Sequence, residues 1–281
     1  EMSVKSSFLA ASVLSVLASA GVNAAFAQAQ TPRAGGTAVF AIGSDPGGFN
    51  RNISTSNADG LVACIVYEGL IDVDPSGKIV PRLAKSWTIS PDGLTYDFQL
   101  NTATWHDGKP FTSADVKYTL LEVSSKFSAV FAGAAKVIDA IDTPAPDRVA
   151  IKLKQAYGPF LMSLGCAQGG AILPEHLFKG TDVAKNPATT TAPVGTGAFT
   201  LAEWRKGAFI RLKKNPNYWD KGLPYLDEVV GQILPQAAAR TQAMLSGNVD
   251  FVSFTLLPSN DYKLVTQSGK FRLTPSPIPS I

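Results

Sequence analysis

The chain has 281 residues, 45% of them hydrophobic and 17% charged, which excludes a disordered chain and is long enough for one or two packed domains. Its formal net charge is only +3, and its densest basic spots are the pairs Arg205-Lys206 and Lys213-Lys214. Because no nucleic-acid motif accompanies these pairs, we expect them to lie on a solvated face and expect no nucleic-acid binding.

The first 27 residues have the layout of a cleavable signal peptide. Lys5 supplies a positive start, residues 8–17 are apolar, and Ala25-Phe26-Ala27 has the small-x-small pattern of a cleavage site. We expect cleavage after Ala27, with Ala29 as the alternative. The apolar stretch is too short for a membrane span, and no cysteine lies near the cleavage site to accept a lipid. The expected product is a free periplasmic protein, not a lipoprotein.

The first predicted elements after the leader are a strand, a loop and a helix. Residues 37–42 favour a strand, and the Gly/Pro-rich residues 43–48 break it. The helix that follows has Ser56 as its N-cap, apolar residues at helical spacing and Gly69 at the position of a C-terminal stop. These elements open the first lobe of the predicted fold.

Alternating apolar residues around turn sequences predict three hairpins. The paired segments are 87–89 with 96–100, 137–141 with 149–153, and 199–203 with 209–212. Between the first two hairpins, Thr112 and Asp115 fit a capping box, while Phe111 and Val116 occupy the positions of a hydrophobic staple. This pattern predicts a helix that runs from Ser113 to about Val123. The middle of the chain therefore has an α+β character.

The last third begins with a Pro/Thr-rich stretch, residues 186–193, which is typical of a linker. Further on, a strand at 229–234, a helix at 236–246 closed by Gly247, and a strand at 251–254 predict a right-handed crossover and a parallel strand pair. The chain then ends in a Pro/Ser-rich run without a closing element. We expect that a further part of the protein is missing here.

Cys64 and Cys166 are the only cysteines, and both lie in apolar segments. In an oxidising compartment two cysteines can pair. The preferred interpretation is nevertheless two buried free thiols, because unpaired cysteine is among the most buried residue types. A disulfide is the alternative.

A set of ordered sequence blocks resembles extracellular solute-binding protein family 5, the dipeptide-, oligopeptide- and nickel-binding components of ABC importers. The blocks are VYEGL at 66–70, PRLAKSW at 81–87, SPDGLTY at 90–96, WHDGKPFTSADV at 105–116, PVGTGAF at 193–199, NPNYW at 215–219, YLDEV at 225–229 and LSGNVD at 245–250. Each block alone is an ordinary turn or cap, but the ordered set is specific. Trp87, Trp105 and Trp219 in these blocks are expected to be packing anchors.

The resemblance implies an α/β clamp of the class II periplasmic-binding-protein type, in which two lobes close on a ligand. After the predicted signal peptide at residues 1–27, the resemblance implies that 28–68 and 193–281 form the first lobe and that 69–192 form an inserted α+β subdomain. The second lobe, which carries much of the cargo recognition in relatives, is missing.

Three segments are candidates for contact with cargo. The loop from Asp45 to Asn50 and the segment from Phe254 to Pro258 both lie at the carboxyl end of a predicted strand, where ligand crevices lie in open α/β sheets. Near Phe127 and Phe131 the family supplies an aromatic to the pocket, although helical spacing favours both as core residues. For Asp45, turn formation is the alternative. The candidate site residues are Asp45, Pro46, Phe49, Asn50, Phe131, Phe254 and Leu256.

The resemblance implies a periplasmic substrate-binding component of an ABC import system that delivers a peptide-like solute to a membrane permease and its ATPase subunits. We expect a monomer without cofactor, metal or catalytic residues. The alternative cargoes are a nickel chelate, heme, glutathione, an opine or an oligosaccharide. The competing class is a secreted hydrolase, which is disfavoured because no catalytic motif occurs and because His106 and His176 both favour surface turns.

Overall fold

The computed structural model describes residues 32–272. The predicted signal peptide lies outside the described residues and stays a prediction. The chain divides into two units, Glu1–Arg33 and Ala34–Ile281, and every element below belongs to the second. Among residues 32–272, no helix is long and apolar enough to cross a membrane.

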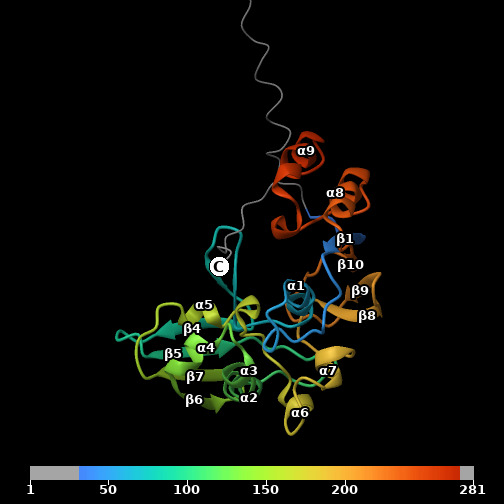
Figure 1. The fold of residues 1–281 in the computed structure, drawn as a ribbon. Helices are drawn as coiled ribbons and strands as arrows, with labels where there is room; N and C mark the ends of the chain where they lie inside the picture. Colours follow the sequence, from blue (N-terminus) through green and yellow to red (C-terminus); the bar gives the residue numbers. More distant parts are fainter. Residues whose placement is uncertain (1–31, 273–281) are drawn as a thin grey trace, which may run out of the picture. The chain divides into compact units, whose positions relative to one another are not determined.

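The first sheet joins segments from opposite ends of the described chain (Figure 1). Its strands are β1 (Thr37–Ile42), β8 (Phe199–Arg205), β9 (Phe209–Lys214) and β10 (Glu228–Ile233), in the order β1-β10-β9-β8. β1 runs parallel to β10, with Val39 opposite Val230, whereas β9 is antiparallel to both of its neighbours. The predicted strand 37–42 and the predicted hairpin of β8 and β9 are confirmed.

The second half of β1 is apolar and buried on both of its faces. Phe40 and Ile42 enter the main hydrophobic core, whereas Ala41 packs in a second cluster that includes Met244 and Val265. That second cluster includes residues of α8 (Ala237–Ser246) and α9 (Tyr262–Gln267). Two short 3-10 helices, η3 (Phe254–Leu256) and η4 (Ser259–Asp261), lie between α8 and α9 in the chain. A strand buried on both faces gains from apolar residues at successive positions.

The predicted strand at 251–254 is wrong. Only Phe251 pairs, through a single parallel bridge to Phe40, and η3 begins at Phe254. β1 therefore lies between this bridge and β10, so the crossover does not join two neighbouring strands. The carbonyl of Leu256 in η3 accepts a hydrogen bond from Arg240 of α8, which ties this segment to the helix. The helix end at Gly247 is confirmed by its left-handed φ of 80°.

The second sheet is antiparallel and has the order β4-β5-β7-β6. Its strands are β4 (Ala84–Ile89), β5 (Thr95–Leu100), β6 (Ile138–Ala145) and β7 (Arg148–Leu153). A two-stranded ribbon, β2 (Ile71–Val73) with β3 (Ile79–Pro81), precedes it. Both hairpins predicted for this part of the chain are confirmed.

The helix predicted from the capping box is confirmed at its start. Thr112 and Asp115 exchange the two hydrogen bonds of the box at the beginning of α2 (Ser113–Tyr118), and Phe111 and Val116 are buried. The helix continues as a π-helical turn, η1 (Thr119–Ser124), and ends in α3 (Ser125–Phe127). Shorter helices complete this region: α4 (Ala132–Val137), α5 (Phe160–Ser163), η2 (Cys166–Gln168) and α6 (Glu175–Phe178).

Two expectations, one about the end of a helix and one about a linker, need correction. Helix α1 (Asn57–Val66) begins at the predicted N-cap Ser56 but ends three residues before Gly69. Gly69 is needed for a different reason, since a Cβ there would lie 2.4 Å from the carbonyl oxygen of Leu164. The predicted linker contains the helix α7 (Pro187–Thr190), and its Ala188 and Thr189 are buried. This stretch is therefore packed against the rest of the protein and is not a linker.

Cys64 of α1 and Cys166 of η2 form a disulfide that closes a sequence separation of 102 residues. The preferred interpretation of two free thiols is therefore wrong, and the alternative holds. Sequence alone could not choose, because only the packing of η2 against α1 brings the two side chains together.

Candidate functional site

The loop between β1 and α1 is held by contacts that use the side chain of Asp45. Asp45 Oδ2 accepts a hydrogen bond of 2.5 Å from the amide of Gly207, and its Oδ1 accepts one of 3.3 Å from the indole of Trp204. Both partners lie at the β8–β9 hairpin. The geometry favours the turn-forming interpretation of Asp45, because its carboxylate already has protein partners.

The other predicted residues of this loop face inward. Pro46, Phe49 and Asn50 are buried, and the ring of Phe49 makes an edge contact with Trp204 at 5.6 Å. The side-chain amide of Asn50 donates to Thr189 Oγ1 at 3.2 Å. These residues hold the loop in position, and small neighbouring residues form its outer surface.

Further hydrogen bonds pin the loop to α1 and to η2. Arg51 Nε donates to the carbonyl of Ala167 at 3.2 Å, next to the disulfide, and its Nη1 donates to the carbonyl of Ser54 at 2.8 Å. The amide of Gly47 donates to Asp59 Oδ1 at 2.8 Å. A loop anchored this way is preorganised, so little ordering entropy is lost when a ligand meets it.

Leu256, one of the candidate site residues, lines a cavity. A hollow of about 240 Å³ lies at the carboxyl ends of β1 and β10, the location expected from the sequence. Phe254 contributes its backbone to η3 nearby. The hollow is lined by Gly43, Ser44, Ser56, Asn57, Ala58, Leu61, Pro235, Arg240 and Leu256.

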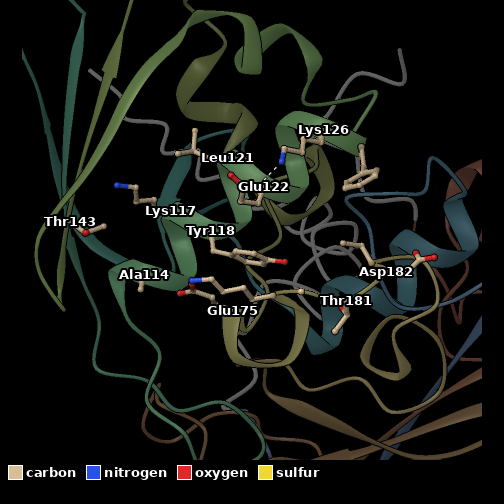
Figure 2. Close-up of a pocket in the computed structure, with 14 residues that line it drawn as sticks. Ala114, Lys117, Tyr118, Leu121, Glu122, Lys126, Thr143, Glu175, Thr181 and Asp182 are labelled. Atoms are coloured by element: carbon tan, nitrogen blue, oxygen red, sulfur yellow. Dashed lines mark hydrogen bonds and ion pairs between the residues drawn. The ribbon is translucent and has the colours of Figure 1, made fainter.

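Phe131 is fully buried in the main core, as its helical spacing favours. Phe127 behaves differently, because 53% of it is exposed. It lines a cavity of about 700 Å³ between α2–η1–α3 and α6. Figure 2 shows Tyr118 in that cavity between Glu122 and Glu175. Burial and these two carboxylates raise the pKa of Tyr118.

Sequence reasoning missed Arg240, a buried residue of α8 that lines the 240 Å³ hollow. Its Nε donates to the carbonyl of Leu256 at 2.6 Å, and its Nη1 donates to the carbonyls of Leu234 and Pro235, each at 2.7 Å. The sequence could have indicated Arg240 because it is an arginine on the helix face that also carries buried apolar residues. A charged side chain is rarely buried unless it has a structural or binding role.

Three of the signature blocks meet at Glu68, which is only 7% exposed. Its Oε1 accepts from the hydroxyl of Tyr218 at 2.7 Å, and its Oε2 accepts from Trp219 Nε1 at 2.8 Å and from Thr196 Oγ1 at 2.9 Å. Burial raises the pKa of the Glu68 carboxyl, while the hydrogen bonds and the charge of Arg82 oppose that rise. The signature therefore builds scaffold, as expected for Trp219.

His106 is not the surface histidine that the sequence favours. Its Nδ1 accepts from the amide of Gly195 at 3.2 Å, and its Nε2 lies 2.9 Å from the carbonyl of Gly197 and donates to it. Burial lowers the pKa of His106, while the hydrogen bond to Gly197 and the charge of Asp107 oppose this. His176 is exposed, as expected, and contacts Asp107 Oδ2 at 2.7 Å.

Across residues 32–272, no three His, Cys, Asp or Glu side chains are grouped closely enough to hold a metal ion. The residues at the end of the first sheet can bind a ligand through hydrogen bonds and charge.

A comparison with known proteins identifies the family of this chain. A sequence profile described as bacterial extracellular solute-binding proteins, family 5 Middle, matches residues 78–278. The chain belongs to this family.

Relatives in the family are similar over most of this chain. A putative ABC transporter peptide-binding protein of Brucella ovis is 35% identical over 247 residues, which is 85% of this chain and 46% of that protein. The oligopeptide-binding protein AppA of Bacillus subtilis, solved with a nonapeptide, matches with a TM-score of 0.73 and 28% identity over 84% of this chain and 47% of its own.

A third relative has the same fold but was solved with a different kind of ligand. The binding protein AgaA from A. tumefaciens R10, solved with agropinic acid, matches with a TM-score of 0.74 and 32% identity over 83% of this chain and 46% of its own. These matches confirm the α/β, periplasmic-binding-protein-like fold. The family 5 chain described here spans less than half the length of these relatives.

Proposed function

We propose that this family 5 chain is part of the substrate-binding component of an ABC importer and that its cargo is a peptide-like solute. The observation that carries the proposal is the family match together with a hollow at the carboxyl ends of the parallel strands β1 and β10. Two of the relatives reported above are named for peptide binding. Binding and delivery need no catalytic step.

The proposed division of labour follows the two sheets. Residues 28–68 and 193–281 are the first lobe, and residues 69–192 are an inserted subdomain. This proposal is supported because the first sheet contains only strands β1, β8, β9 and β10, whereas the second contains only strands from the middle of the chain. The cargo is expected to lie between the first lobe and a second lobe, in a clamp that closes around it.

The proposed location is the periplasm, reached through the signal peptide at residues 1–27 with cleavage after Ala27. The family's description as extracellular supports an exported protein. The proposed partners are a membrane permease with its ATPase subunits, and the binding protein itself is proposed to be a monomer.

A second cargo class has specific support, because the relative AgaA binds agropinic acid on the same frame. Thermal-shift screening of the natural protein that contains this chain, with its leader removed, separates the classes. Dipeptides and oligopeptides are expected to raise the melting temperature, since a ligand at 100 times its Kd stabilises by about 2.7 kcal/mol. Stabilisation by agropinic acid, glutathione, a nickel chelate or an oligosaccharide, with none by peptides, overturns the peptide proposal.

A further inference from the structure

Arg240 carries a buried charge that no carboxylate balances. The residue is 8% exposed, and its three hydrogen bonds go to the neutral carbonyls of Leu234, Pro235 and Leu256. Within the described residues, Arg240 takes part in no ion pair. Buried charges are normally paired, because removing an ion from water is costly. A buried guanidinium bonded only to carbonyls therefore still attracts an anion.

One edge of this guanidinium is open. Nε and Nη1 of Arg240 donate to carbonyls, whereas Nη2 has no acceptor among the described residues. Nη2 is also absent from the fully buried orphan atoms of that part of the chain, which are Asn52 Oδ1 and Arg211 Nε. It therefore has access to open space, and Arg240 lines the 240 Å³ hollow.

The first turn of α1 lines the same hollow as Arg240 of α8. The helix has ten residues, and Ser56, Asn57 and Ala58 all border the cavity. The amides of Asn57 and Ala58 have no acceptor among residues 32–272, and they carry the positive end of the helix dipole. Asp59, the acidic residue of this turn, points elsewhere, since its Oδ1 accepts from Gly47.

The shape of the hollow suits one end of a ligand. A Cβ on Gly43 would lie 2.9 Å from Leu256 Cδ2 and 4.0 Å from Arg240 Nη1, so a side chain here would narrow the space beside the guanidinium. Cavities that enclose a whole drug-sized ligand measure about 300–1,000 Å³. At about 240 Å³, this hollow is large enough for a terminal group only.

We propose that the hollow lined by Arg240 and the first turn of α1 is a carboxylate subsite, which holds one acidic end of the cargo. The proposal rests on the proposed binding function and adds the group that this lobe recognises. Guanidinium and helix-terminal amides are the donors that carboxylates meet in proteins, and charge-assisted hydrogen bonds to them are about twice as strong as neutral ones.

The test uses the chain itself with N-acetyl-L-alanine as the probe and N-acetyl-L-alanine amide as its uncharged match. Backbone amide NMR shifts of Asn57 and Ala58, together with the Arg240 Nε signal, are followed during titration. The acid is expected to move all three signals in one saturable process, and the amide to move none. Equal responses to acid and amide, or none to either, overturn the proposal. Tighter binding of inorganic phosphate overturns the carboxylate assignment.

Substitution of Arg240 is uninformative alone, because the side chain also ties three carbonyls. Ser44→Glu keeps Arg240 and places a carboxylate at an exposed position on the hollow. Ser44→Glu is expected to lower the affinity for the acid probe at least tenfold. Ser86→Glu, at an exposed serine of β4, is expected to leave that affinity unchanged. Unaltered probe binding in Ser44→Glu overturns the proposal.

A comparison of peptide acids with their C-terminal amides separates this subsite from the binding function as a whole. In the natural protein, peptides with a free C-terminus are expected to stabilise more than their C-terminal amides. Equal stabilisation by both forms overturns the subsite and leaves peptide binding intact. Stabilisation by no peptide overturns the proposed cargo, while the response of Asn57 to the acid probe in the chain still reports on the subsite.

Discussion

The carboxylate of Glu68 accepts a 2.7 Å hydrogen bond from the hydroxyl of Tyr218, 150 residues further along the chain. Both side chains are buried, so neither has water as a substitute partner. This bond joins the end of α1 to the turn after β9, and the indole of Trp219 reinforces it. Tyr218 also makes a tilted ring contact with Trp219 at 5.4 Å.

Tyr218→Phe is expected to lower the free energy of unfolding by about 1–3 kcal/mol, because it leaves a buried carboxylate oxygen of Glu68 without its donor. Urea denaturation followed by fluorescence measures the change. Tyr225→Phe is the matched control, since Tyr225 is 44% exposed and is expected to tolerate the same loss of a hydroxyl within about 0.5 kcal/mol. Equal effects of the two substitutions contradict the role assigned to the Glu68 carboxylate.

Removing the disulfide with Cys64→Ser and Cys166→Ser is expected to cost about 3–5 kcal/mol, because the cross-link closes a long loop of the unfolded chain. Thermal melts with and without dithiothreitol measure it. The reductant is expected to lower the melting temperature of the unsubstituted chain and to leave the double variant unchanged. Two titratable free thiols in the oxidised, folded chain contradict the cross-link.

His106 is expected to make stability fall in mild acid. Because burial lowers its pKa in the folded chain below the ordinary value of 6.5, the unfolded chain takes up the proton first as the pH falls. The free energy of unfolding is therefore complete above about pH 6.5 and decreases as the pH drops toward the folded pKa. Compared with His106→Gln in urea melts at pH 7.5 and 5.5, the unsubstituted chain is expected to lose its advantage at the lower pH. A constant difference between the two proteins contradicts this.

Asp45→Ala is expected to loosen the loop that borders the hollow, because the amide of Gly207 and the indole of Trp204 lose their common acceptor. The cost in stability is about 1 kcal/mol. Binding of N-acetyl-L-alanine is expected to weaken as well, since the loop no longer starts in position. Asp92→Ala removes a comparable turn carboxylate, which accepts from Leu94, at a distance from the hollow. Asp92→Ala is expected to leave probe binding unchanged; an equal loss in both variants contradicts the preorganisation.

Local patterns account for the elements that the sequence predicted well. The capping box of Thr112 and Asp115 and the N-cap Ser56 act within three residues, so their geometry follows from the chain nearby. The hairpins follow from alternation around turn residues for the same reason. The ordered signature blocks identified the family, because many short motifs in one order are specific even where each is ordinary.

Contacts between distant segments account for what the sequence left open or had wrong. The pairing of Cys64 with Cys166, the burial of His106 against Gly197 and the packing of α7 depend on which surfaces meet, and no local pattern encodes that. The site changed in the same way. Asp45, Phe49 and Asn50 are candidates for cargo contact, and the structure shows that they also hold the loop, because each has a partner from beyond residue 188.

The sequence by itself determined the family, the start of α1 and α2 and the hairpins, because these follow from short-range chemistry and from motif order. It also predicted a cargo crevice at the strand ends, and only the tertiary structure decided which side chains line the hollow found there. Arg240 reaches it because α8 packs over the end of β10 and η3 folds back onto it, and a buried charge has meaning only once its neighbours are known.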